Sequence, residues 1–242
     1  MDRSLKIARS LLFSASLTVT ALASERAIVS VKCPLDGTEF EAVQDFSGYA
    51  EGQRLDLKKL GPISQPPALA RCPQCSFPIF SKYLDAPLAT RIRAILAGER
   101  FRTEAVPAKP WFALGILREE LGADPFEIGW TYLNATWEAE DEGGRYAPAA
   151  ERALAWFERA AEARRDDPER RRDCHVALYL AVELSRRLGR FDEARQKLTR
   201  LDGVVDEELR WLASAKAAQA RLIAARKSAP DDGREDLPPP PR

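Results

Sequence analysis

The chain has 242 residues, and its 37 Lys and Arg residues balance 37 Asp and Glu residues, so the formal net charge is zero. A chain without a positive excess lacks the long-range attraction on which non-specific binding to nucleic acid or to anionic membranes depends. We therefore expect no nucleic-acid partner. The length is enough for one or two small domains.

Residues 1–23 predict a secretory signal peptide. Arg3, Lys6 and Arg9 form a positive segment, residues 10–20 are uncharged and mostly apolar, and residues 21–23 (Ala-Leu-Ala) have the small-x-small pattern of a cleavage site. The apolar stretch is shorter than the roughly 20 apolar residues of a membrane-spanning helix. We expect a periplasmic or secreted protein with no stable membrane insertion after cleavage. The alternative is an uncleaved segment that tethers the chain to a membrane.

Residues 24–85 predict a small β module built around two cysteine turns. Residues 27–32 are rich in β-branched residues and predict a strand that leads into Cys33, and residues 38–43 alternate like a returning strand. Residues 45–70 contain scattered Gly and Pro and predict mostly loop. The second turn, Cys72 to Cys75, is flanked by short segments that repeat the strand–turn–strand design.

Residues 86–227 predict a helical domain, in which 86–97 form a first short helix. Gly122 with Pro125, Gly143-Gly144, Pro168 and Gly189 predict where helices stop. Three apolar stripes have helical spacing. They comprise Ala153, Leu154, Phe157, Ala160 and Ala161; then Ala177, Leu180, Ala181, Leu184 and Leu188; and finally Val205, Leu209, Leu212, Gln219 and Leu222. Residues 228–242 contain five prolines and many charges, which predicts a disordered tail.

A short pattern, G-x-[YF]-x-x-A, occurs twice in the helical half, once from Gly144 and once from Gly189. It resembles the turn and second-helix start of the tetratricopeptide repeat. The copies are 45 residues apart (189 − 144), which is longer than the usual repeat of about 34. The predicted fold is therefore α+β and predominantly α, with a zinc-ribbon-like module followed by a tetratricopeptide-like array of helical hairpins. The alternative is a non-repeating helical bundle.

Cys33, Asp36, Cys72 and Cys75 form the candidate metal site. In a zinc ribbon, each C-P-x-C-G turn directs two ligands at one ion, and the Gly adopts a left-handed backbone. Here Asp36 stands at the second ligand position of the first turn and Ser76 replaces the second Gly. A carboxylate oxygen binds zinc at about 2.0–2.2 Å, so the set is chemically sound for a structural zinc ion.

Three alternatives remain open for these cysteines. Export to an oxidising compartment favours disulfides, such as Cys33 with Cys72 or Cys75. Cys72 and Cys75 could instead be a thioredoxin-like redox pair, but such a pair opens a helix, and Pro78 would interrupt it. In the third alternative Cys174 or His175 replaces Asp36 as the fourth ligand.

Three segments carry a resemblance to a known family: Cys33-Pro-Leu-Asp-Gly-Thr-Glu-Phe, Leu60-Gly61-Pro62 and Cys72-Pro-Gln-Cys-Ser-Phe. Over residues 28–84 the chain resembles an uncharacterised bacterial domain-of-unknown-function family, which joins a C-P-x-C-G-T-x-F and a C-P-x-C-G-[YF] turn to a tetratricopeptide-like region. The resemblance implies metal ligands at Cys33, Cys72 and Cys75 and places Asp36 where the family has a fourth cysteine. It implies no particular activity.

The sequence contains none of the common nucleotide-binding, hydrolase or metalloprotease motifs. We therefore expect a non-catalytic scaffold that binds a protein or peptide partner through the helical array. The alternative is a thiol–disulfide or metal-handling protein that uses Cys72 and Cys75. Six aromatic residues of the helical half are expected mostly in the core, with some lining a groove for the partner. They are Trp111, Trp130, Tyr132, Trp137, Trp156 and Trp211.

Overall fold

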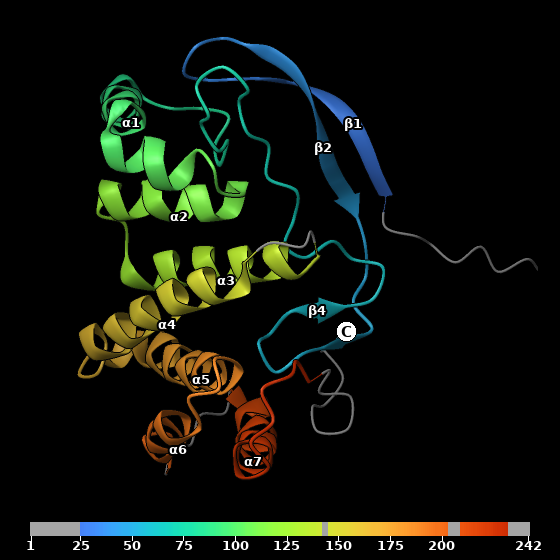
Figure 1. Ribbon diagram of the computed structural model, residues 1–242, viewed down its shortest axis with the longest axis vertical. Coiled ribbons are helices and arrows are strands. Elements are labelled where there is room, and N and C mark those ends of the chain that lie inside the picture. Colours follow the sequence, from blue (N-terminus) through green and yellow to red (C-terminus); the bar gives the residue numbers. More distant parts are fainter. Residues whose placement is uncertain (1–24, 142–144, 203–208, 232–242) are drawn as a thin grey trace, which may run out of the picture.

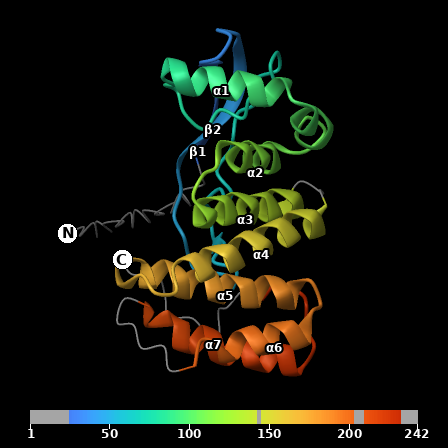
Figure 2. The same ribbon diagram turned by 90° about the vertical axis from the view of Figure 1, so that its left-hand side faces the viewer.

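The computed structural model describes residues 25–141, 145–202 and 209–231 of the chain. The fold is α+β and mainly α. Figures 1 and 2 show the helices stacked in a column from α1 to α6 and α7, with the strands along one side of the column. The elements are β1 (Glu25–Lys32), β2 (Glu39–Ser47), β3 (Gly52–Gln53), β4 (Lys59–Leu60), α1 (Ala86–Ala97), the π-helix η1 (Phe101–Ala105), α2 (Pro110–Leu121), α3 (Pro125–Asp141), α4 (Tyr146–Ala163), the 3-10 helix η2 (Pro168–Arg170), α5 (Arg171–Arg187), α6 (Phe191–Thr199) and α7 (Trp211–Ala224).

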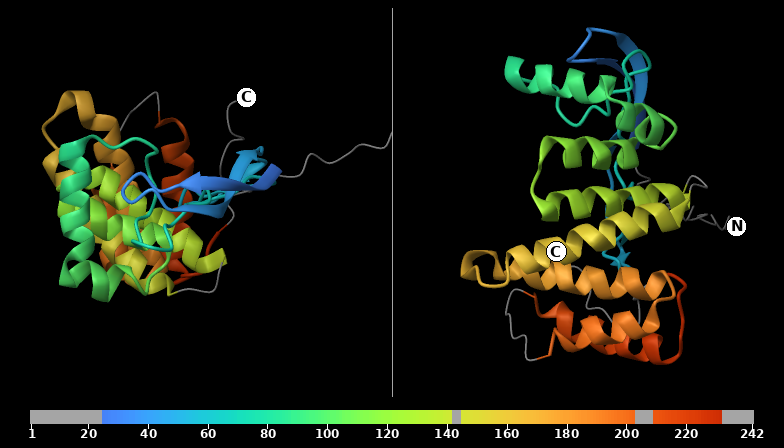
Figure 3. Two further views of the ribbon diagram at one scale, coloured as in Figure 1. Left: turned by 90° about the horizontal axis from the view of Figure 1, so that it is seen from above. Right: turned by 60° about the vertical axis from the view of Figure 1, so that its left-hand side comes forward.

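The strands form two separate two-stranded sheets. β1 pairs antiparallel with β2, from Lys32 opposite Glu39 at the turn to Glu25 opposite Ser47 at the open end, which confirms both predicted strands and extends them. Seen from above, this hairpin projects sideways from the helices (Figure 3). β3 and β4 pair within the segment predicted as mostly loop.

The second cysteine turn lacks the flanking strands that the sequence predicts. One isolated bridge joins the two sides of this turn, between Arg71 and Pro78; it is flanked by hydrogen bonds from the N–H of Cys72 to the carbonyl of Phe77 (3.0 Å) and from the N–H of Ile79 to that of Ala70 (2.8 Å). Beyond Ile79 the N–H of Phe80 donates to the carbonyl of Pro78 (2.9 Å), so the chain turns locally and the pairing ends. The strand–turn–strand prediction is therefore confirmed for the first turn and wrong for the second.

The helix boundaries follow the local signals in the sequence. Helix α1 begins after Asp85, whose carboxylate accepts a hydrogen bond of 2.7 Å from the N–H of Leu88. Helix α2 begins at Pro110 and ends before Gly122, which has a φ of 66°. The three predicted apolar stripes are buried on α4, on α5 and on α7 with the residues before it, where Leu209 lies; Leu188, after α5, is half-buried, and Val205 is outside the described residues.

Successive helices pack closely because small residues stand at the contacts. A Cβ atom added to Gly115 on α2 would lie 2.5 Å from ring atoms of Tyr132 on α3, and one added to Gly129 on α3 would lie 2.8 Å from the ring of Phe157 on α4. Both aromatic rings are fully buried. The missing side chains therefore let the rings fill the space between the helix axes.

The two copies of the G-x-[YF]-x-x-A pattern occupy equivalent places. Tyr146 is the first residue of α4 and Phe191 is the first residue of α6. Ala149 and Ala194, three residues further, are both buried. Gly189 has a φ of 76°, as a tight turn requires, whereas Gly144 lies outside the described residues.

The turn between β3 and β4 inserts into the helical column. Leu55 is fully buried, and its carbonyl oxygen accepts a 2.7 Å hydrogen bond from the hydroxyl of Tyr179 on α5. Asp56 is also buried and accepts from the indole Nε1 of Trp137 at 3.1 Å and from Arg187 at 3.4 Å. A segment predicted as loop thus belongs to the core of the helical half.

Three further predictions concern residues that the structure leaves undescribed. The predicted signal peptide, residues 1–23, lies outside the described residues, as do residues 232–242 of the predicted tail and Gly143-Gly144. Across the described ranges, no helix combines the length and apolar character needed to cross a bilayer.

Candidate metal centre

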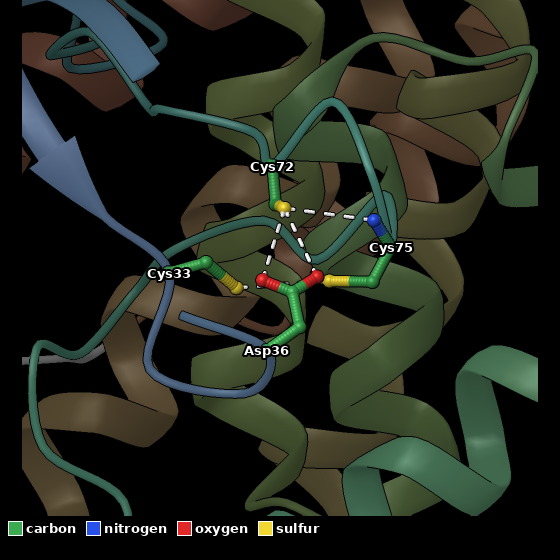
Figure 4. Close-up of side chains that lie close together, drawn as sticks. All are labelled: Cys33, Asp36, Cys72 and Cys75. Atoms are coloured by element: carbon green, nitrogen blue, oxygen red, sulfur yellow. Dashed lines mark hydrogen bonds between the residues drawn. The ribbon is translucent and has the colours of Figure 1, made fainter. Parts of the chain in front are cut away.

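The four predicted ligands meet at one point. Cys33 and Asp36 come from the turn that follows β1, and Cys72 and Cys75 come from the second turn, 39 residues further along the chain (72 − 33). One ligand atom from each residue lies within 4.8 Å of all the others. Figure 4 shows the four side chains pointing toward one another from opposite turns.

The two turns have the same backbone. In the first, the N–H of Gly37 donates to the carbonyl of Cys33 (3.0 Å) and the N–H of Cys33 donates to that of Thr38 (2.8 Å). In the second, Ser76 donates to Cys72 (2.9 Å) and Cys72 donates to Phe77 (3.0 Å). Gly37 and Ser76 both have left-handed backbones, with φ values of 77° and 61°. Ser76 thus adopts the conformation that the sequence pattern reserves for glycine.

Two of the distances between ligand atoms are close to the edges of a tetrahedron around zinc. With Zn–S bonds of about 2.3 Å, two sulfurs of a regular tetrahedron lie about 3.8 Å apart, and a sulfur and an oxygen about 3.6 Å apart. The Sγ atoms of Cys33 and Cys75 are 3.7 Å apart. The Sγ of Cys72 lies 3.5 Å from Oδ2 of Asp36. The donor set and these spacings fit a zinc ion.

Burial and charge differ between the ligands. Cys33 and Cys72 are each 1% exposed, Cys75 is half-buried and Asp36 is exposed. Burial raises the pKa of the Cys33 and Cys75 thiols. The backbone N–H of Thr38 donates to Oδ1 of Asp36 (2.9 Å) and lowers the pKa of that carboxyl below its usual range. Asp36 is therefore charged and already oriented without a metal.

The structure weighs against two of the alternatives for the cysteines. The residues after Cys75 form a turn and the Arg71–Pro78 bridge instead of the helix that a thioredoxin-like pair would open. Cys174 lies on α5 in a different hydrophobic cluster, and its Sγ is 3.3 Å from the carbonyl oxygen of Ala161. The idea that Cys174 or the adjacent His175 supplies the fourth ligand is therefore wrong. All four cysteines are unbridged.

The cysteine turns share one hydrophobic core with the first helices. Side chains of both turns pack with α1, η1 and α2 in this core. Its members include Cys33, Leu35, Cys72 and Phe77 from the turns and Ile92, Phe101, Leu114 and Leu117 from the helices.

Two arginines that sequence reasoning did not single out hold the turns in place. Arg93 on α1 donates to the carbonyl of Leu35 at 2.7 Å. Arg71, directly before Cys72, donates to the carbonyls of Ala105 (3.0 Å), the last residue of η1, and of Ala108 (2.8 Å), just beyond it. Every residue type has a backbone carbonyl, so the identity of the partner residues gives no sequence signal for these contacts.

A hollow of about 1120 Å³ lies beside the metal centre. Its walls are β2, the loop from Lys58 to Arg71, and the adjoining ends of α2 and α3. Trp111 at the start of α2 lines it, and its indole Nε1 donates to the carbonyl of Pro67 at 3.0 Å. Trp111 is itself half-buried against the first core, and it is the one of the six aromatic residues that lines this hollow.

Comparisons of the chain with protein-family models, with curated proteins and with solved structures found no match.

Proposed function

We propose that this chain is a non-catalytic, exported interaction protein in which a structural zinc ion joins two cysteine turns and thereby caps a tetratricopeptide-like helical array. The observation that carries the proposal is the convergence of the four ligand atoms within 4.8 Å of one another, with a Cys33–Cys75 sulfur separation of 3.7 Å. The equivalent positions of Tyr146 and Phe191 support the repeat-like reading of the array.

A metal at this site would have a clear structural task. The first turn ends β1 and begins β2, whereas the second turn is fixed to η1 through Arg71. A zinc ion bound to both turns would therefore hold the β1–β2 hairpin against the helices. The two short sheets do not make this connection, because each pairs only its own two strands. Thiolate ligands in tetrahedral geometry favour zinc over magnesium or calcium.

The metal proposal is tested by zinc analysis of the full-length protein and of two cysteine variants. We expect one zinc per chain in the unmodified protein. Cys72→Ser should lose the zinc and lower the melting temperature, because it removes a buried ligand. Cys174→Ser is the matched control, since Cys174 is also buried but lies in the other core, and it should keep its zinc. Full zinc retention by Cys72→Ser would contradict the proposal.

The hollow beside Trp111 is the surface that we propose for a protein or peptide partner. The turn from Arg54 to Lys58 already covers part of the helical column, whereas the hollow is open and combines an aromatic side chain with charged residues at its edge. Its volume of about 1120 Å³ is at the upper end for ligand pockets, so it is large enough for several side chains of an extended peptide.

This proposal predicts a difference between two tryptophan variants. Trp111→Ala should lose a partner that co-purifies with the unmodified protein from the exported fraction. Trp156→Ala should retain it, because Trp156 lies away from the hollow, where its Nε1 donates to Glu119. Equal recovery of the partner by both variants would rule out the hollow as its binding site.

A further inference from the structure

We infer that Cys33 and Cys75 are a redox-modifiable pair: a peroxide converts them to a disulfide, the metal leaves, and Cys72 remains a thiol. The release of metal rests on the zinc site proposed above, whereas the choice of the pair rests on the positions of the sulfur atoms alone. The inference differs from what spacing suggests, because a C-x-x-C sequence would pair Cys72 with Cys75.

The orientation of the side chains selects the pair. The Sγ atoms of Cys33 and Cys75 face each other at 3.7 Å across the gap between the turns. The Sγ of Cys72 is turned toward the carboxylate of Asp36, at 3.5 and 3.8 Å from its two oxygens, and accepts a contact from the N–H of Cys75 at 3.5 Å. Figure 4 shows the Cys72 sulfur above the Asp36 carboxylate and the sulfurs of Cys33 and Cys75 at its two sides.

Exposure determines which sulfur an oxidant reaches first. Cys75 is half-buried and stands beside exposed Asp36, whereas Cys33 and Cys72 are each 1% exposed. A peroxide entering past the carboxylate therefore meets Cys75. Zinc keeps its cysteine ligands as thiolates, which are the forms that react with peroxides.

The reaction balances with hydrogen peroxide as the oxidant. The Cys75 thiolate attacks one peroxide oxygen and breaks the O–O bond, which gives a sulfenic acid and, after protonation, one water. The Cys33 thiolate then attacks the Cys75 sulfur, forms the S–S bond and expels a second water. The two sulfurs lose two electrons in total and the peroxide gains them. Counting the proton taken up by Cys72, three protons are consumed and one zinc ion is released.

The disulfide would join the same two turns that the metal joins. Cys33 and Cys75 are 42 positions apart in the chain, and one belongs to each turn. Oxidation would therefore exchange one cross-link for another at the same place. In an oxidising compartment this would keep the hairpin attached to the helices after the metal is lost.

The test uses the full-length, zinc-loaded protein treated with hydrogen peroxide, followed by alkylation and digestion with trypsin. Cleavage after Lys32, Arg54, Arg71 and Lys82 yields one peptide with Cys33 and another with both Cys72 and Cys75. A Cys33–Cys75 bridge joins these two peptides and leaves Cys72 alkylated. A Cys72–Cys75 bridge stays within one peptide. A zinc-sensitive dye measures the released metal in parallel.

We expect the joined peptides with alkylated Cys72, one zinc released per disulfide, and reversal of the bridge by dithiothreitol. Cys174→Ser should give the same products, and Cys75→Ser should give no joined peptides. A Cys72–Cys75 bridge, a Cys33–Cys72 bridge, or sulfinic acid without a bridge would overturn the inference. If the untreated protein holds no zinc, the metal proposal fails, and the peptide map of the metal-free protein still decides the pairing.

Discussion

Replacing Asp36 tests the role of the carboxylate most directly, because this residue distinguishes the site from a four-cysteine ribbon. Asp36→Ala removes the oxygen that lies 3.5 Å from the Cys72 sulfur. Loss of residues that only support a metal ligand costs about 10–100-fold in affinity, so loss of the ligand itself should cost at least about 100-fold.

The expected change in stability follows from mass action. With free zinc buffered at about 100 times the dissociation constant of the unmodified protein, binding stabilises that protein by about 2.7 kcal/mol. At the same zinc concentration a 100-fold weaker variant gains only about 0.4 kcal/mol. The difference, about 2.3 kcal/mol, corresponds to a melting temperature lower by about 5–9 °C for a chain of this size.

Two matched variants separate metal binding from local structure in a thermal melt with buffered zinc and with chelator. Asp36→Asn keeps an oxygen that can accept from the N–H of Thr38 but removes the charge, so it should bind zinc more weakly while resembling the unmodified protein in chelator. Asp36→Cys supplies a fourth thiolate and should bind zinc more tightly. The reasoning is refuted if Asp36→Ala and the unmodified protein bind zinc with equal affinity.

Three further predictions concern the turns, the helix contacts and pH. Ser76→Gly should stabilise the fold by about 1 kcal/mol in chemical denaturation, because Ser76 has a φ of 61° and glycine adopts this conformation without steric cost; a destabilised variant would contradict this reading. Gly115→Ala should destabilise by about 1–3 kcal/mol, because the new Cβ would lie 2.5 Å from the buried Tyr132 ring, whereas Gly52→Ala, with open space around it, should not suffer this clash. Zinc affinity should fall as the pH is lowered, because burial raises the pKa of the Cys33 and Cys75 thiols and both must lose a proton to bind. Calorimetry in buffers of different ionisation enthalpy should show the release of at least about two protons per zinc at pH 7. Release of no protons would show that these thiols are not ligands.

The sequence was sufficient for features that depend on short-range patterns. The spacing of Cys33, Asp36, Cys72 and Cys75 identified a group that the fold brings within 4.8 Å. Gly122 ends α2 in a left-handed conformation and Pro125 begins α3, and both effects depend only on the local backbone. The helical repeat of 3.6 residues places the apolar residues of each stripe on one face, and that face is buried whichever helix packs against it.

The features that escaped prediction depend on contacts between distant parts of the chain. Leu55 and Leu57 alternate with charged residues over only five positions, a run too short to mark Leu55 as buried, yet Leu55 enters a core formed by helices 70 or more residues away. Arg71 and Arg93 bind carbonyl oxygens, and any residue can supply a carbonyl. Residues 77–80 are apolar enough to predict a strand, but a local hydrogen bond from the N–H of Phe80 to the carbonyl of Pro78 ends the pairing after one bridge.

The placement of the two cores explains why a metal would be useful in this chain. The cysteine turns have no core of their own, because Leu35 and Phe77 are buried against α1, η1 and α2, while Leu55 is buried against the helices further down the column. A two-stranded hairpin is marginally stable alone in water, and β1–β2 carries exposed Ile28, Val43 and Phe46. The segment between β1 and the second turn is thus held to the helices at its ends, at the turn from Arg54 to Lys58 and at the contact between Trp111 and Pro67. A zinc ion at Cys33, Asp36, Cys72 and Cys75 would fix the end that lies beside the Trp111 hollow, so the metal would set the shape of the surface on which a partner would bind.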